Sequence, residues 1–330
     1  MQRFRNSGKR LVSQRWRDKL PPLHMSAESA SSTRLKLWGV RGSIPVPGPR
    51  TVRYGGNTAC VEIRADGELI VLDAGSGIRE LGLALQKEFG STPINLSLLI
   101  THVHWDHILG FPFFLPSYSD KNQIRIFGYD GADVGLREIL QGQMATPFFP
   151  IALYDLPGKI QFENLESMDF KIGKVRVCAR QMNHPGVCVG YRIFTSKGSV
   201  AYLPDHEPYE ACKLHAAKSQ ALSPEQAKQR AGEDRAELVK FLAGSDILIL
   251  DTQYTDEEYS THVGWGHGSL SAAISLAVDA GVRRLVLFHH DPKHDDQTID
   301  EMVQTARKLA AKSQAKLEVD GAREGAEMTL

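Results

Sequence analysis

One stretch decides the fold: Thr101-His102-Val103-His104-Trp105-Asp106-His107. It follows an apolar, strand-like run at residues 96–100. In an extended segment, residues two apart point the same way, so His102 and His104 can share one metal ion. If a helix begins near Asp106, then Asp106 and His107 are placed to bind a second metal. Imidazole and carboxylate groups are the ligands expected for zinc, and manganese or iron would also suit them.

Three more candidate ligands lie further along the chain, because one motif cannot complete the shells of two metals. Each stands at or just beyond the end of a predicted strand: His184, Asp205 and His289. Ligands in layered α/β folds gather beyond strand ends, so these side chains are expected to converge on the motif. A carboxylate that bridges two metals at Asp205 would leave a coordination position for water, whose pKa then falls towards neutrality.

The order of these groups resembles the five-motif signature of the metallo-β-lactamase superfamily. The groups are Asp73 in Leu72-Asp73-Ala74-Gly75, the motif from His102 to His107, and then His184, Asp205 and His289. The resemblance covers about residues 34–330. It implies an α/β fold, the αββα sandwich, in which two mixed β-sheets pack face to face between outer helices with the metals at one edge. It also implies that Asp73 orients a ligand and is not itself a metal ligand.

A second resemblance concerns Gly266-His267-Gly268-Ser269, which lies 22 residues before His289. It is similar to the branch that contains RNase Z and the phosphoribosyl cyclic phosphodiesterase of phosphonate breakdown. In RNase Z a histidine at the equivalent place donates to a phosphate oxygen or to the leaving group. The resemblance therefore implies that His267 assists catalysis beside the metals, with Asp106 as the other catalytic residue. The alternative is that His267 only precedes the helix that starts near Ser269.

Two Gly-rich segments near the start of the domain also look typical of phosphodiesterase-like members of this superfamily. They are Trp38-Gly39-Val40-Arg41-Gly42-Ser43 and Tyr54-Gly55-Gly56-Asn57-Thr58. Their turns could wrap the site, but ordinary loop turns explain the glycines equally well.

The rest of the chain alternates between strand-like and helix-like segments, as expected for a layered α/β domain. Helical periodicity predicts helices at 78–89, 225–243, 270–280 and 299–312. Short β-rich runs predict strands at 35–38, 60–63, 69–73, 94–100, 124–127, 175–181, 189–194, 200–203, 247–251 and 284–289.

Composition excludes several classes of protein. The 39 basic residues balance the 39 acidic ones, so a strongly basic nucleic-acid-binding surface is not implied. The four cysteines are far apart in the sequence, which suits a reducing, cytoplasmic location better than a disulfide scaffold. No apolar run approaches the length that spans a bilayer, so no membrane association is expected.

Two segments are set apart from the body of the domain. Residues 1–33 are basic and then Ser-rich, and we expect a disordered tail, with either Met1 or Met25 as the true start. Residues 34–330 form the hydrolase domain. A polar, Ala- and Lys-rich stretch predicts a helical insertion at about 207–243, which would be either a lid or a plain solvated helical hairpin.

These observations predict a hydrolase in which two divalent metals, zinc in the first instance, activate water for attack on a small phosphodiester such as a cyclic nucleotide or cyclic phosphate. His184 and Asp205 are only 21 residues apart, so the long arm with which bacterial-type RNase Z grips tRNA is absent. Structured RNA is therefore not expected as the substrate, while a homodimer is compatible with the sequence.

Two alternatives stay open. One is an RNA or DNA end-processing nuclease, and the other is a thioester or lactone hydrolase on the same fold. Some aromatic residues near the motifs could stack on a nucleobase or could simply belong to the core: Trp105, Trp265, Phe148 and Phe149.

Overall fold

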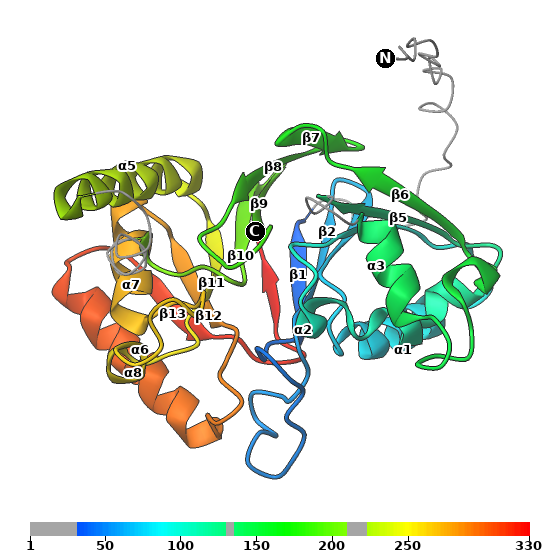
Figure 1. The fold of residues 1–330 in the computed structure, drawn as a ribbon, viewed down its shortest axis with the longest axis horizontal. Coiled ribbons are helices and arrows are strands. Elements are labelled where there is room, and N and C mark those ends of the chain that lie inside the picture. Colours follow the sequence, from blue (N-terminus) through cyan, green and yellow to red (C-terminus); the bar gives the residue numbers. More distant parts are fainter. Residues whose placement is uncertain (1–31, 130–134, 210–222) are drawn as a thin grey trace, which may run out of the picture.

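Two β-sheets face each other in the middle of the molecule, and helices cover their outer faces (Figure 1). The computed structural model describes residues 32–129, 135–209 and 223–330. In this part of the chain each sheet has seven strands, and the layers run helix, sheet, sheet, helix. The αββα sandwich implied by the sequence is confirmed.

The first sheet comes from the N-terminal half of the chain, closed by one strand from the C-terminus. Its first strands pair antiparallel and its later ones, from β3 to β6, pair parallel. In order across the sheet the strands are β14 (Glu327–Thr329), β1 (Arg34–Gly39), β2 (Cys60–Ala65), β3 (Glu68–Leu72), β4 (Asn95–Leu99), β5 (Gln123–Gly128) and β6 (Lys159–Asn164).

The second sheet repeats this plan. An antiparallel run from β7 to β10 is followed by parallel strands from β10 to β13. In order across the sheet the strands are β13 (Glu318–Gly321), β12 (Arg284–Phe288), β11 (Ile247–Asp251), β10 (Gly198–Leu203), β9 (Val189–Thr195), β8 (Val175–Gln181) and β7 (Asp169–Ile172). Strand β11 is buried along its whole length, as expected for the apolar run 247–250 that makes up most of it.

The helices are divided between the two outer faces (Figure 1). On the side of the first sheet lie α1 (Ile78–Phe89) and α3 (Leu136–Gln143), with the short α2 (Trp105–Ile108) and three 3₁₀ helices (Phe111–Phe113, Leu115–Tyr118 and Leu153–Asp155). On the side of the second sheet lie α5 (Pro224–Leu242), α6 (Asp256–Tyr259), α7 (Leu270–Asp279) and α8 (Asp296–Lys312). None of the helices in the described ranges combines the length and the apolar character needed to cross a membrane.

Local sequence signals explain where the long helices begin and end. In α1 the buried residues Ile78, Leu81 and Leu85 recur on one face. Gly90, with φ 56°, follows the helix in the conformation that glycine adopts at low cost. The helix predicted at 299–312 begins three residues earlier, because Asp295 accepts a hydrogen bond from the backbone N–H of Thr298 and caps α8.

The elements that the sequence did not predict are short or lie at a sheet edge. Strand β6 is exposed along most of its length, β7 has four residues and β14 has three. Such strands carry little apolar periodicity, so their pairing is set by the neighbouring strand.

The carboxyl ends of the parallel strands come together at one edge of the sandwich. Two hydrogen bonds tie the sheets there: the Tyr202 hydroxyl donates to Asp73 (2.9 Å), and the Tyr191 hydroxyl donates to the carbonyl of Ile100 (2.7 Å). Both tyrosines are fully buried. This edge therefore brings together chain segments that follow β3, β4, β10, β11 and β12.

The proposed tail and insertion fall partly outside the described residues. Of the tail, residues 1–31 lie outside them, and Thr33 is already buried, with its carbonyl accepting a hydrogen bond from Leu330. Of the stretch 207–243, residues 210–222 lie outside the described ranges and most of the remainder forms α5. This helix packs beside α7 on the second sheet through a buried face that includes Leu238 and Leu242. The domain boundaries remain a proposal.

Candidate metal centre

The central motif lies in the turn from β4 into α2. His104 is the residue directly before α2, in extended backbone (φ −62°, ψ 151°), and the helix starts at Trp105. Asp106 and His107 fall in its first turn and are buried, as is His102. The predicted change from extended chain to helix near Asp106 is confirmed. His104 is exposed, so it faces the opening of the site to solvent.

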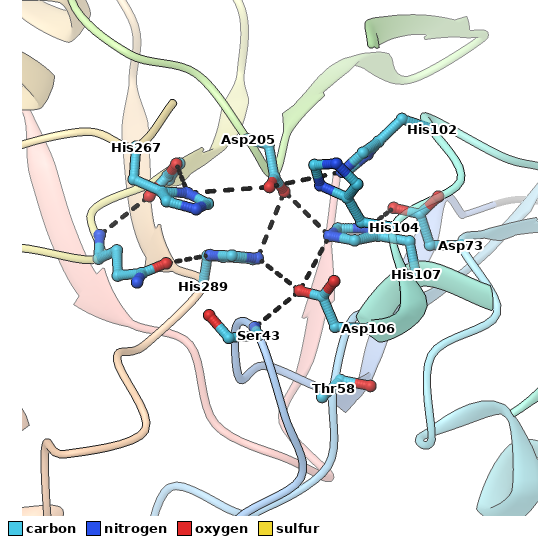
Figure 2. A network of polar contacts seen from close by, with 12 residues as sticks. Ser43, Thr58, Asp73, His102, His104, Asp106, His107, Asp205, His267 and His289 are labelled. Carbon is cyan, nitrogen blue, oxygen red and sulfur yellow. Dashed lines mark hydrogen bonds and ion pairs between the residues drawn. The ribbon is translucent and has the colours of Figure 1, made fainter. Parts of the chain in front are cut away.

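The carboxylate of Asp205 lies between two groups of imidazoles (Figure 2). Its Oδ2 is 3.6 Å from Nε2 of His102 and 3.7 Å from Nε2 of His184. Its Oδ1 is 3.0 Å from Nε2 of His107 and 3.3 Å from Nε2 of His289. Each carboxylate oxygen therefore faces its own pair of ring nitrogens, an arrangement suited to a carboxylate that bridges two cations.

The first ligand set gathers around Oδ2 of Asp205. It consists of His102, His104, His184 and Asp205, whose ligand atoms all lie within 4.8 Å of one another. His104 enters this set through Nδ1, which is 3.1 Å from Nε2 of His184. Four ligands of the imidazole and carboxylate type at this spacing suit one divalent metal.

The second ligand set gathers around Oδ1 of Asp205. Asp106, His107 and His289 form it, again with ligand atoms within 4.8 Å of one another. Oδ2 of Asp106 is 3.1 Å from Nε2 of His289 and 3.3 Å from Nε2 of His107. The backbone N–H of Ser43 donates to the same Asp106 oxygen at 2.7 Å and fixes its position (Figure 2).

Several atoms at this centre lack the partners that buried polar atoms normally have. Within the described part of the chain, Nε2 of His102, Nε2 of His107 and Oδ1 of Asp205 are buried and make no hydrogen bond of good geometry. The short separation of His107 from Asp205 does not satisfy the directional requirement of a hydrogen bond. Unpaired buried donors and acceptors are rare in folded proteins. Cations between these atoms would satisfy all three, so the residues present fit divalent metals.

The far side of each ring is held by a hydrogen bond that orients it. Asp73 accepts from Nδ1 of His107 (2.8 Å), from the Tyr202 hydroxyl and from the hydroxyl and backbone N–H of Thr101. Because the Thr101 hydroxyl donates to Asp73, it can accept from Nδ1 of His102, 3.1 Å away. Asp73 thus contacts the outer nitrogen of His107, the position expected for a residue that orients a ligand.

The histidines from the second sheet are oriented in the same way. Nδ1 of His184 donates to the carbonyl of Gly266 (2.8 Å), and Nδ1 of His289 donates to Oε1 of Gln253 (2.9 Å). The amide nitrogen of Gln253 in turn donates to Asp291, which fixes the side-chain amide with its oxygen towards the ring. In both histidines Nε2 faces Asp205.

His267 stands beside the two ligand sets with a carboxylate partner of its own. Its Nδ1 donates to Oδ2 of Asp251 at 2.9 Å and is 3.8 Å from Oδ2 of Asp205 (Figure 2). Its ring stacks on that of His289, with centroids 4.9 Å apart. Burial opposes protonation of His267, but the charge and hydrogen bond of Asp251 outweigh it and raise the pKa to about 9. The hydrogen bond to Asp251 occupies Nδ1 and leaves Nε2 as the ring nitrogen of His267 that can act on a ligand.

The centre concentrates negative charge that its histidines compensate. Burial opposes ionisation of Asp205, but the facing His289, His107 and His102 outweigh it and hold the pKa of this carboxyl well below its usual range. The pKa of Asp106 is likewise held low against burial, by His107 and His289. Both carboxylates are therefore ionised and ready to bind cations.

Backbone conformation and close packing fix His289 in place. His289 has φ 61°, a left-handed conformation that a residue with a side chain adopts only at a cost of roughly 1–2 kcal/mol. Its ring lies against Gly42, where an added Cβ would be 2.3 Å from Nδ1. Gly42 in turn donates its N–H to the carbonyl of His290. The turn at Gly42, in the first of the two Gly-rich segments, therefore wraps the site and is not an ordinary loop turn.

Comparisons with known proteins agree with this geometry. A model of the Beta-lactamase superfamily domain matches residues 69–223. The ribonuclease Z of Thermoplasma acidophilum is 26% identical over 305 residues, which cover 84% of this chain and 92% of that protein. The chain is similar to proteins of the metallo-β-lactamase superfamily.

Solved structures show how far the fold is shared. The metallo-beta-lactamase fold protein YhfI from Bacillus subtilis superposes with a TM-score of 0.62 at 17% identity, over 91% of this chain and 100% of that one. A diphosphatase from the PhnP family has a TM-score of 0.58 at 17% identity, over 90% of this chain and 97% of that one. Within the superfamily the chain is similar to the RNase Z-like branch, and it is a metallo-hydrolase.

The structure brings all the candidate residues from the sequence into one cluster, and it adds residues that the sequence analysis missed. Asp251, the last residue of β11, holds His267, and Gln253, two residues further on, holds His289. Their position offered a signal, since the rule that polar residues beyond strand ends form sites applies to β11 as it does to β12. Ser43 offered none, because it reaches the centre only through its backbone N–H.

The contact between Gly42 and His289 gives the first prediction. Gly42→Ala should push the His289 ring out of the second ligand set, because the new methyl group would overlap it. Metal content should fall, and hydrolysis should fall by about a hundredfold, a typical effect of misplacing a reactive group by an ångström. Elemental analysis and kinetics of the purified variant would measure both.

Gly142→Ala is the matched control, since an added Cβ at this helical position meets nothing within 4 Å. It should behave as wild type. Equal metal content and activity in the two variants would show that the Gly42 turn does not hold His289.

Proposed function

We propose that this protein is a dinuclear zinc phosphodiesterase that hydrolyses small phosphodiesters of the cyclic nucleotide or cyclic phosphate class. The observation that carries the proposal is the position of Asp205, with one oxygen facing each set of ring nitrogens. The first metal would be held by His102, His104, His184 and Asp205. The second would be held by Asp106, His107, His289 and the other oxygen of Asp205.

Two zinc ions at these ligands would supply Lewis-acid stabilisation of the phosphoryl charge and would make water nucleophilic near neutral pH. The chain's own residues then have separate roles. Asp106 and Asp205 remain ionised and can accept the proton of the attacking water. The orienting partners Asp73 and Gln253 keep the ligand rings from turning as charge shifts.

His267 is proposed to donate a proton from Nε2 to the leaving oxygen. Asp251 holds the opposite side of the ring and favours its protonated form. Stacking on His289 keeps the ring beside the second ligand set. A donor held at this place suits the negative charge that develops on the departing oxygen.

The proposed substrate is small because the chain lacks a long arm between His184 and Asp205, which are 21 residues apart. One observation favours the nuclease alternative as strongly: the relatives found by sequence are named ribonuclease Z. The same catalytic groups could hydrolyse a small phosphodiester or an RNA. The two proposed functions therefore differ only in how the surroundings of the centre bind the substrate.

Metal content tests the dinuclear centre. Elemental analysis of protein purified without chelator should find two zinc ions per chain, and Asp205→Ala should lose most of both because each set loses its shared ligand. His102→Ala should bind about one metal less. Hydrolysis should be abolished in both variants, and the melting temperature should fall as metal is lost.

His262→Ala is the control for these variants, because His262 belongs to neither ligand set. It should keep two metals per chain. A wild-type protein that folds, and that binds no transition metal when supplied with zinc or manganese, would refute the centre.

His267→Ala isolates the proton donor. This variant should keep both metals and a near-normal KM, while kcat on a dialkyl phosphodiester falls by roughly two to four powers of ten. The loss should shrink for an ester of p-nitrophenol, whose leaving group needs little protonation. Equal losses on both esters would contradict proton donation, and loss of metal would show that His267 is itself a ligand.

Substrate choice separates the remaining readings. The zinc protein should cleave a nucleoside 2′,3′-cyclic phosphate with a higher kcat/KM than a precursor tRNA, a thioester or a lactone. Efficient single-site cleavage of the precursor tRNA would establish the nuclease instead. Turnover of only the thioester or lactone would place the chemistry outside phosphoryl transfer.

A further inference from the structure

Two tryptophans that are close in the chain to residues of the metal centre have exposed indoles. Trp105, between His104 and Asp106 in the chain, is 82% exposed, and Trp265, two residues before His267, is 61% exposed. Tryptophan carries the largest apolar side chain, and folded proteins usually bury most of it. Two exposed indoles within two residues of site residues therefore call for a function.

Three imidazole rings form a row from His104 to His267. The ring of His104 is 4.9 Å from that of His184, and the ring of His184 is 5.4 Å from that of His267. Trp105 directly follows the first of these histidines, and Trp265 lies two residues before the last. In the chain the two tryptophans therefore belong to opposite ends of this row, so a single nucleobase can reach one of them and not both.

Trp265 is exposed but it is not loosely held. The buried carboxylate of Glu207 accepts hydrogen bonds from the backbone N–H groups of Gly264 (2.6 Å) and Gly266 (2.9 Å), on either side of it. The same carboxylate accepts from the hydroxyl of Tyr259 (2.9 Å). A buried carboxyl group that accepts hydrogen bonds from both neighbours of an exposed indole fixes its backbone before any ligand arrives.

The indole itself is supported by a second ring. His262 meets it edge to face, with centroids 4.9 Å apart, and His262 stacks on Tyr254 at 4.5 Å. Nδ1 of His262 also donates to the carbonyl of Glu258 (2.7 Å). Binding surfaces that are ordered in advance lose less entropy when a ligand docks, so a supported, exposed indole is suited to recognition.

We propose that Trp265 binds the nucleobase of a nucleotide-derived phosphodiester by stacking, and so makes this substrate class preferred over base-free diesters. The inference rests on the proposed function, because it concerns the substrate of the same centre. A flat, rigid indole matches the face of any of the bases, and such stacking typically contributes about 1–3 kcal/mol per base. An aliphatic substituent would gain only the contact area.

The experiment compares two five-membered cyclic diesters that differ in the base: a nucleoside 2′,3′-cyclic phosphate and glycerol 1,2-cyclic phosphate. Trp265→Ala should lower kcat/KM on the nucleotide by about 5- to 150-fold, mostly through KM, the range that corresponds to such stacking. Activity on the glycerol compound should be unchanged. Trp265→Phe should recover most of the loss, because phenylalanine also stacks.

Tyr154→Ala is the matched control. Tyr154 is 79% exposed but lies on the 3₁₀ helix between α3 and β6, with no site residue next to it in the chain. Its removal should leave the preference between the two diesters unchanged.

A binding measurement makes the test independent of turnover. Titration of the zinc-loaded protein with adenosine 3′-monophosphate should quench tryptophan fluorescence. Trp265→Ala, which keeps Trp16, Trp38 and Trp105, should lose this quenching. If wild type hydrolyses neither diester but still shows this quenching, the proposed function is wrong and the proposed base site is supported.

Other outcomes would overturn the base site alone. Equal losses on both diesters, or no loss on the nucleotide, would mean that the Trp265 indole does not recognise a base. A changed oligomeric state in Trp265→Ala, with the preference between diesters intact, would assign this indole to an interface between subunits. In each of these cases hydrolysis of the glycerol diester by wild type would keep the phosphodiesterase proposal.

Discussion

The buried carboxylate of Asp205 is the group on which the rest of the centre depends. An ionised carboxyl removed from water costs several kcal/mol unless opposite charge compensates it. Here the compensation comes from imidazoles on both of its sides, carried by segments that follow β4, β8 and β12. Those segments belong to different sheets, so the compensation exists only when the two sheets pack with their strand ends at one edge. Metal binding at this centre would accordingly be coupled to the folding of the whole sandwich.

The repeated plan of the two sheets makes this meeting of strand ends possible. Each sheet runs from antiparallel strands into parallel ones, and an aspartate follows the first strand of each parallel set. The two aspartates have different partners. The oxygens of Asp73 accept hydrogen bonds from Thr101, Tyr202 and the outer nitrogen of His107. Asp205 faces inner ring nitrogens instead and keeps an oxygen without a hydrogen-bond partner in the described structure. Equivalent places in the topology thus supply one orienting residue and one candidate ligand.

Precision at the centre is obtained at some cost in local stability. Asp73 and His289 both have left-handed backbone, with φ of 60° and 61°, although neither is a glycine. Their hydrogen bonds and packing hold them there, and strain of this kind is characteristic of functional sites. The buried guanidinium of Arg41 contributes to this support. It donates to the carbonyls of Gly55, Asp291 and His294, and so connects the Gly-rich turn to the loop that follows His289.

The sequence by itself determined much of this protein. The alternation of apolar segments predicted the layers, and α1, β8 and β11 have the ends that periodicity predicted for them. The spacing of His102, His104, Asp106 and His107 in one extended-to-helical segment was enough to predict a metal centre, because neighbouring ligands in a chain are constrained by local geometry alone. The tertiary structure decided what local geometry does not reach. Only the packing of the sheets shows that each oxygen of Asp205 faces a different ligand set, that Asp251 holds His267 and that Ser43 supports Asp106 through its backbone. Such contacts join residues tens to hundreds of positions apart, and a backbone N–H carries no side-chain signature that a sequence could display.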